Sequence, residues 1–336
     1  MPPTLHIPFH EMLAQFRRIL IALDFEESRA AQCARIFAET SLDGVYSHGV
    51  LRFPRFVDYI KKGYVDVHAE PSKIASLGAL EQWDGNLGPG PLNAMFAADR
   101  AMRLADEFGL GLVALGNTNH WMRGGTYGWH AAKAGYGYLG WTNTEPNMPA
   151  WGAAESRLGN NPLVIALPFG DEAIVLDMAM TQFAYGKLED YKLQGKKLPI
   201  PGGFDRSGKV TDDPAAILDS MLGLPIGYWK GAGLSLLLDL MAATLSGGRD
   251  VKRLGELESE YGVSQVFMAF NLKNLPNAAH IQNNLARAID FVKASTPISG
   301  DQDILYPGER ALKTRAENMA KGIPTPKEVW EKIRGF

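Results

Sequence analysis

The middle of the chain alternates between strand and helix patterns, and this alternation limits the possible fold more than any other feature. Helical spacing of apolar residues occurs at 92–108 and 124–134. Short apolar runs typical of buried strands occur at 76–83, 111–115, 138–144, 163–167 and 174–178. Strands and helices in such alternation favour a mixed α/β domain.

Both ends of the chain show mainly helical patterns instead. Apolar residues recur at helical spacing over 11–23 and about 26–40, and Pro54 suits the first turn of a third helix. The last ninety residues contain one strand pattern, at 264–271. The length of 336 residues exceeds what one hydrophobic core usually serves. We therefore expect a helical domain made of 1–72 plus 250–336, and an α/β domain at 73–249.

Composition and charge exclude several classes of function. The net charge of −3 offers no basic excess for a phosphate backbone, so we expect no nucleic-acid partner. The longest apolar runs, such as 234–238, are too short to span a membrane, and the N-terminus lacks a signal-peptide pattern. The single cysteine, Cys33, permits no internal disulfide. These features predict a cytoplasmic protein, and no histidine spacing predicts a metal site.

Residues 44–56 read Gly-Val-Tyr-Ser-His-Gly-Val-Leu-Arg-Phe-Pro-Arg-Phe and form the most informative motif. Imidazole is suited to proton transfer near neutral pH, which makes His48 a candidate acid or base. Guanidinium is suited to holding a carboxylate, which makes Arg52 a candidate for an acidic substrate. A structural histidine in a turn between two helices, with arginines on the surface, explains the motif equally well.

Of two glycine-rich strings, only the second is a candidate ligand-binding site. Gly135-Tyr-Gly137-Tyr-Leu-Gly140 matches GxGxxG, but a helix pattern precedes it and a strand pattern follows. A dinucleotide fingerprint needs the opposite order, so we expect no Rossmann fold. The segment 227–233 precedes an apolar helix pattern, and Lys230 with Trp229 could hold a phosphate-bearing ligand there. A loop entering a buried helix is the alternative interpretation.

Three further positions are candidates for ligand contacts. His120 follows the strand at 111–115, where loops often contact ligands, although a helix-capping role explains it too. Asp177 leaves a predicted strand, and its carboxylate could bind a ribose or orient a base. Asn143 adds an amide at the end of another strand.

The motifs in combination resemble the malate/L-lactate dehydrogenase-type oxidoreductases that lack a Rossmann domain and, more narrowly, the 2,3-diketo-L-gulonate reductase subgroup. The resemblance covers nearly the whole chain. It is carried by residues 44–56, Ser76–Asp84, Asn119–Gly125, Met148–Ala153 and Gly227–Gly231. It implies an α/β fold in which a non-Rossmann mixed sheet domain lies beside a helical domain built from both chain termini.

The resemblance also implies roles for particular residues. His48 corresponds to the proton donor, and we expect Ser47, Arg52, His120 and Asn143 to contact the substrate. The nicotinamide cofactor is expected along three segments: Ala173, Ile174, Val175, Leu176, Asp177, Met178 and Ala179; then Trp229 and Lys230; then Gly308, Glu309 and Arg310. The subgroup carries Gly-His-Glu where this chain has Gly308-Glu309-Arg310. We therefore expect NADH as the cofactor, with NADPH as the alternative. Homodimers that share an active site are implied as well.

We therefore predict an NAD(P)H-dependent reductase of an α-keto sugar acid, which converts 2,3-diketo-L-gulonate to 3-dehydro-L-gulonate with His48 as the proton donor. One alternative is a malate-, L-lactate- or ureidoglycolate-type dehydrogenase, or a cyclic imine reductase, of the same family. An alternative of another class is a non-catalytic protein that binds a sugar acid. A hydrolase using His48 with Asp177 lacks a nucleophile motif or a metal set.

Overall fold

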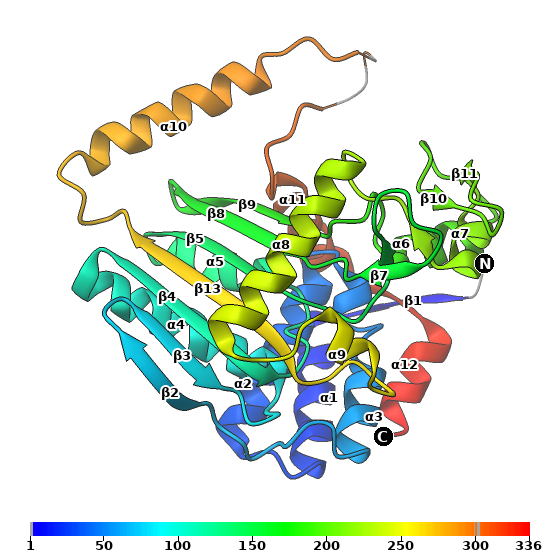
Figure 1. Cartoon of the computed structure of the whole chain (residues 1–336), viewed down its shortest axis with the longest axis horizontal. Helices are drawn as coiled ribbons and strands as arrows, with labels where there is room; N and C mark the ends of the chain where they lie inside the picture. Colours follow the sequence, from blue (N-terminus) through cyan, green and yellow to red (C-terminus); the bar gives the residue numbers. More distant parts are fainter. Residues whose placement is uncertain (1–2, 299, 301–302) are drawn as a thin grey trace.

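The computed structural model describes residues 3–298, 300 and 303–336. Its centre is a seven-stranded sheet with the order β2-β3-β4-β13-β5-β8-β9 (Figure 1). The strands are β2 (Ser72–Leu77), β3 (Leu80–Asp84), β4 (Leu110–Thr118), β5 (Tyr136–Thr142), β8 (Leu163–Phe169), β9 (Glu172–Met178) and β13 (Val263–Asn271). Only β3 and β4 pair in parallel within this sheet. A Rossmann sheet is mostly parallel, so the expected non-Rossmann mixed sheet is confirmed.

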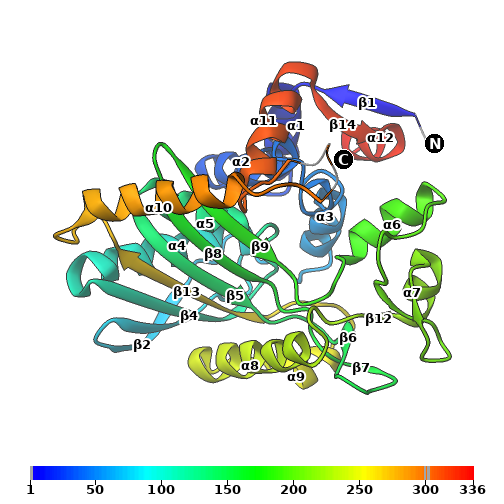
Figure 2. The ribbon, with the colours of Figure 1, turned by 90° about the horizontal axis from the view of Figure 1, so that it is seen from above.

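Helices cover both faces of the sheet (Figure 2). On one face, α4 (Gly90–Phe108) and α5 (Gly125–Lys133) pack on Val113 and Leu115. On the other face, α8 (Trp229–Ser246) packs on Ala114, and α9 (Val251–Gly255) follows it. Neighbouring residues of β4 therefore enter different cores, because side chains alternate between the faces of a strand.

The two chain ends pack together into a helical part. It contains α1 (Phe9–Ala22), α2 (Glu27–Leu42), α3 (Phe53–Lys61), α11 (Glu309–Lys321) and α12 (Lys327–Arg334). Phe53 fixes α3 in this core, with ring centroids 4.0 Å from Phe16 and 5.1 Å from Phe37. Two short strands that the sequence patterns did not predict, β1 (Thr4–Ile7) and β14 (Ile323–Pro326), pair antiparallel and join the two ends.

A small unit with a core of its own follows β9. It contains α6 (Tyr185–Leu193), α7 (Pro214–Ser220), β10 (Gly203–Phe204), β11 (Val210–Thr211) and β12 (Leu222–Gly223). Two short strands, β6 (Met148–Pro149) and β7 (Ser156–Leu158), pair beside it, and α10 (Ala278–Lys293) extends outward from the end of β13 (Figure 1). Among the helices of the described residues, none has the length and apolar character that crossing a bilayer requires.

Three segments differ from the sequence-based expectation. The single strand expected at 76–83 is a hairpin, because Gly78 turns the chain with a φ of +57°. The glycine-rich loop expected at 227–233 is mostly helix, because α8 already begins at Trp229. Strand β13, which lies beyond residue 249, pairs with β4 and β5 at the centre of the sheet.

Candidate functional site

His48 ends a short 3₁₀ turn, η1 (Tyr46–His48), between α2 and α3. The turn is held by the His48 amide, which donates to the Val45 carbonyl at 3.1 Å. Gly49 is required here, because a Cβ at this position would collide with the Ser41 hydroxyl. That hydroxyl accepts a hydrogen bond from the Val50 amide at 2.8 Å. The tight packing therefore holds the imidazole on a rigid support.

Two imidazoles meet at this point of the fold. The His48 and His120 rings lie nearly parallel, with centroids 5.8 Å apart. The Met122 amide donates to Nδ1 of His120 at 2.9 Å, so the ring proton of neutral His120 lies on Nε2. Ser47 Oγ lies 3.0 Å from Nδ1 of His48. Three of the expected residues are therefore neighbours, and His120 retains a hydrogen-bond donor for a ligand.

The surroundings disfavour positive charge on both rings. Burial lowers the pKa of His48 to about 4, and the nearby Arg52 and Arg123 guanidinium groups add to this shift. Burial also lowers the pKa of His120 well below its usual value, with Arg52 and His48 contributing. In the free protein both imidazoles are therefore neutral at pH 7.

Arg52 forms no direct ion pair in the described structure, although the Glu260 and Glu145 carboxylates partly oppose the lowering of its pKa by burial. It lies at the start of α3, is partly buried, and has no ion-pair partner within the described part of the chain. Together with Arg55, Tyr59, Asn119 and His120, it lines a small cavity of about 20 Å³. Because a buried charge without a partner is unfavourable, an anionic ligand group is the expected complement of this guanidinium.

A buried ion-pair cluster behind His48 was not predicted from the sequence. Arg123, which is 6% exposed, pairs with Asp43 at the end of α2. The other Asp43 oxygen accepts from Arg315 of α11 at 2.7 Å. The Asn-His-Trp-Met-Arg motif contains Arg123, but no local pattern indicates that it pairs with Asp43, 80 positions away. The cluster joins the end of α2, the segment just before α5, and α11 close to the His48 imidazole.

Two expected ligand residues are bound by the protein itself. Asn143 is fully buried, and its amide donates to Asp239 at 2.8 Å and to the Arg249 carbonyl at 2.7 Å. Its Oδ1 accepts from the Ser264 amide at 2.7 Å. Asp177 accepts the Gly125 amide at 2.8 Å but remains exposed at the end of β9. Only Asp177 of this pair is thus open to a ligand.

The three segments expected to hold a cofactor lie along β9. The Val175 amide donates to the Pro307 carbonyl at 2.9 Å, which places Gly308–Arg310 beside the middle of the strand. The Ile226 amide donates to the Met180 carbonyl at 2.9 Å, which places the start of α8 beside the strand's end. A Cβ on Gly308 would lie 3.1 Å from Trp129 and 3.2 Å from the Val175 amide, so only glycine leaves room there.

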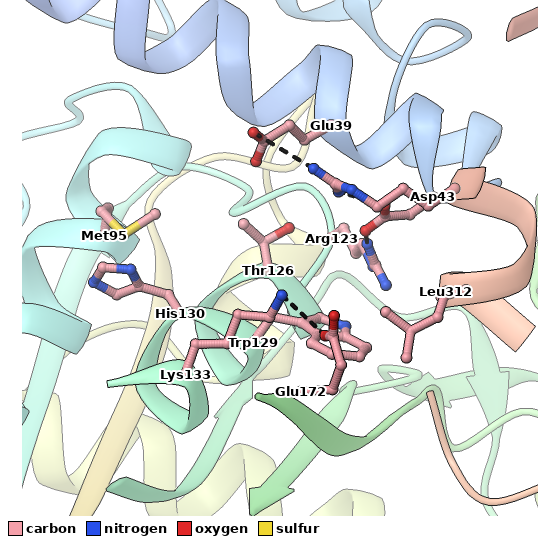
Figure 3. Close-up of a pocket in the computed structure, with 12 residues that line it drawn as sticks. Glu39, Asp43, Met95, Arg123, Thr126, Trp129, His130, Lys133, Glu172 and Leu312 are labelled. Carbon is pink, nitrogen blue, oxygen red and sulfur yellow. Dashed lines mark hydrogen bonds and ion pairs between the residues drawn. The ribbon is translucent and has the colours of Figure 1, made fainter. Parts of the chain in front are cut away.

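A larger cavity opens between α2, α5 and α11 (Figure 3). Its volume of about 360 Å³ lies within the range of small-molecule sites. Trp129 projects into it from α5, and its Nε1 is buried without a hydrogen-bond partner in the described structure. Leu312 enters from α11, one turn after Gly308. The cavity therefore adjoins both the expected cofactor segment Gly308–Arg310 and the Asp43–Arg123 pair.

Comparisons with known proteins identify relatives that share the sequence pattern and fold of this chain. The model of the malate/L-lactate dehydrogenase family matches residues 7–334. The chain is 44% identical to a 2,3-diketo-L-gulonate reductase from Pasteurella multocida, over 98% of this chain and 99% of that protein. It is also similar to the solved sulfolactate dehydrogenase from Methanocaldococcus jannaschii, with 28% identity, a TM-score of 0.90, and coverage of 98% and 95%. A malate dehydrogenase from Entamoeba histolytica shares the fold, with 23% identity, a TM-score of 0.93, and coverage of 99% and 97%.

Proposed function

Since this chain belongs to the malate/L-lactate dehydrogenase family of oxidoreductases, we propose that it reduces an α-keto sugar acid, namely 2,3-diketo-L-gulonate to 3-dehydro-L-gulonate. The high identity to 2,3-diketo-L-gulonate reductases supports this substrate. The observation that carries the proposal is the grouping of His48, His120 and the unpaired Arg52 around one site. These three side chains can bind a carboxylate and donate a hydrogen bond or a proton to the keto oxygen next to it.

The chain's own residues supply binding and the proton. Arg52 holds the substrate carboxylate, and Nε2 of His120 donates a hydrogen bond to a substrate oxygen. A nicotinamide, when bound, supplies the hydride to the keto carbon. Protonated His48 delivers the proton to the developing alkoxide, with Ser47 positioning the imidazole through Nδ1. Asn143 acts indirectly, because its amide already fixes the end of β5 to Asp239 and Ser264.

The residues along β9 fit a nicotinamide cofactor. Asp177 is exposed near the end of β9, and its carboxylate can accept ribose hydroxyls. Gly308 lets the third segment pack closely on Trp129 and Val175 beside that strand. At the start of α8, the exposed Trp229 ring offers a flat surface, and Lys230 Nζ lies 5.9 Å from its centroid. We propose that Ala173–Ala179, Trp229, Lys230 and Gly308–Arg310 hold it, and that NADH is the physiological form.

We also propose that the chain acts in the cytoplasm as a homodimer. The outer side of α8 leaves large apolar side chains uncovered, with Leu237 58% and Met241 47% exposed. On α10, Phe291 is 82% exposed. Exposed apolar surface of this extent is typical of an interface, and a second copy of the chain is the partner that the family resemblance implies. The buried, unpaired Cys33 agrees with a reducing compartment.

A panel of keto acids with NADH and with NADPH, followed at 340 nm, tests the proposed reaction. We expect the highest kcat/KM for 2,3-diketo-L-gulonate with NADH. Higher values for oxaloacetate, pyruvate or a cyclic imine would assign the chain to another activity of the family. Binding of cofactor without turnover of any compound would support a non-catalytic binding protein.

A further inference from the structure

The first turn of α6 packs directly against the turn that carries His48. Gly186 lies in this part of α6, and a Cβ built on it would be 2.8 Å from the Ser47 Cβ and 3.5 Å from the Ser47 Oγ. Carbon atoms in contact are normally about 3.5–4.0 Å apart. A side chain at position 186 would therefore push the two segments apart by about 1 Å.

Backbone conformation does not account for this glycine. Gly186 lies within a regular helix, and its φ is outside the left-handed region that favours glycine. Inside a helix alanine is the more favourable residue, because glycine loses more backbone freedom on folding. Close packing on Ser47 is thus the physical reason for a residue without a side chain at this position.

Hydrogen bonds on the other side of α6 hold its first turn against Ser47. The Tyr185 hydroxyl donates to the carbonyls of Asn147 and Met221. Burial raises the pKa of Tyr185 to about 12, so this hydroxyl keeps its proton at the pH of an enzyme assay. Just before the helix, the Gln182 amide donates to the Leu224 carbonyl at 2.7 Å. These bonds keep α6 from moving away when its contact with Ser47 becomes too close.

The contact at Gly186 bears on the acid–base group because Ser47 is the hydrogen-bond partner of His48. Ser47 Oγ lies 3.0 Å from Nδ1 of the imidazole. In the protonated ring, Nδ1–H donates to this oxygen, which leaves Nε2–H to donate to the substrate. N–H···O distances seldom exceed about 3.2 Å, so a shift of the Ser47 side chain by several tenths of an ångström is enough to break the bond.

We propose that Gly186 is a positioning residue for proton transfer: by leaving space for Ser47, it lets the first turn of α6 hold Ser47 Oγ at Nδ1 of His48. Tyr185 supports this role, because its hydroxyl anchors the same turn. The assignment rests on the proposed function, since it takes His48 as the proton donor. A misplacement of about 1 Å in groups that orient a reaction can cost about a hundredfold in rate.

Steady-state kinetics of 2,3-diketo-L-gulonate reduction by the full-length chain test the assignment. We expect Gly186→Ala to lower kcat about tenfold to a hundredfold, with NADH affinity in a fluorescence titration unchanged within about twofold. Ser47→Gly removes the atoms that the new Cβ would meet. Adding Gly186→Ala to Ser47→Gly should therefore lower kcat by less than about twofold further. Glu189→Ala, at an exposed position of the same helix, is the matched control and should change neither quantity.

The hydrogen bond itself can be followed without turnover. In the protein labelled with ¹⁵N-histidine, the ring nitrogen signals of His48 are identified by their loss in His48→Asn. The Nδ1 signal reports the bond to Ser47 in the free protein. We expect Gly186→Ala to shift this signal, because the bond is lost, and Glu189→Ala to leave it in place.

Three results would each overturn the assignment: a wild-type kcat in Gly186→Ala, an unchanged Nδ1 signal in that variant, or an equal loss of kcat when the substitution is added to Ser47→Gly. If Gly186→Ala does not fold, Tyr185→Phe replaces it, with Tyr191→Phe in the same helix as its control. The expected changes are then smaller, and an unchanged kcat or signal remains decisive.

The two proposals can fail separately. A shifted Nδ1 signal in Gly186→Ala, in a protein whose wild type reduces no keto acid, would refute the proposed reaction only. Reduction of 2,3-diketo-L-gulonate by wild type and Gly186→Ala at equal rates would refute the positioning role only.

Discussion

The lowered pKa of His48 makes a sharp prediction about how the reaction responds to pH. Reduction requires the imidazolium form, whereas the free protein holds this ring neutral with a pKa of about 4. Above that pKa, the protonated fraction falls tenfold for each pH unit. We therefore expect kcat/KM for the keto acid to fall about 100-fold between pH 5 and pH 7, because this parameter reports the protein before substrate binds. An ordinary histidine with a pKa of about 6.5 would give about a fourfold fall.

The opposite direction supplies an internal control. Oxidation of the hydroxy acid needs neutral His48, and this form already exceeds about 90% at pH 5 if the pKa is about 4. Its kcat/KM should therefore stay nearly flat from pH 5 to pH 8. Initial rates at 340 nm with saturating cofactor measure both profiles. A plateau in reduction that extends to pH 6.5 would show that burial and the two arginines do not set the acidity of the proton donor.

Three other variants test separate parts of the account. Between pH 7 and pH 5, the free energy of unfolding should fall by about 2 kcal/mol less in His48→Asn than in the wild type, because a histidine with a depressed folded-state pKa costs stability as pH drops below 6.5. If urea titrations show the same fall for the wild type and the variant, this reasoning is contradicted. Asp43→Asn leaves Arg123 buried without its partner and should lower the free energy of unfolding by about 3–5 kcal/mol. Asp58→Asn removes an exposed ion pair and should lower it by under about 1 kcal/mol. Similar denaturation midpoints for the two variants would refute the difference. Arg52→Ala should raise KM for the keto acid about tenfold to a hundredfold, and an unchanged KM in steady-state kinetics would remove Arg52 as the carboxylate anchor.

Local sequence signals were enough to predict that the central residues of the candidate site lie together. Ser47, His48 and Arg52 lie within six residues, so one turn and the start of one helix were enough to place them together. The reversed order around Gly135 also excluded a Rossmann fold correctly, since α5 precedes this glycine and the other two glycines of the string lie within β5.

Long-range pairings could not be predicted in this way. Asp43 and Arg123 are 80 positions apart, and Glu145 and Glu260 are 115 apart, so no local pattern indicates either contact. Strand β13 showed its strand pattern but not its place at the centre of the sheet, because pairing partners are set by tertiary packing. The helical start at Trp229 was missed for a different reason. Gly231 normally weakens a helix, but here a Cβ would collide with the Ile226 carbonyl.

The most direct test of the central claim is a paired measurement on His48→Asn: NADH affinity by fluorescence titration, and the rate of 2,3-diketo-L-gulonate reduction by the same preparation. We expect a reduction rate about 10²- to 10⁴-fold below the wild type, because general acid catalysis is lost. The NADH affinity should stay within about twofold, since the proposed cofactor segments lie along β9 and not on the turn at His48. A variant that binds NADH normally and still reduces the diketo acid at the wild-type rate would show that another group delivers the proton.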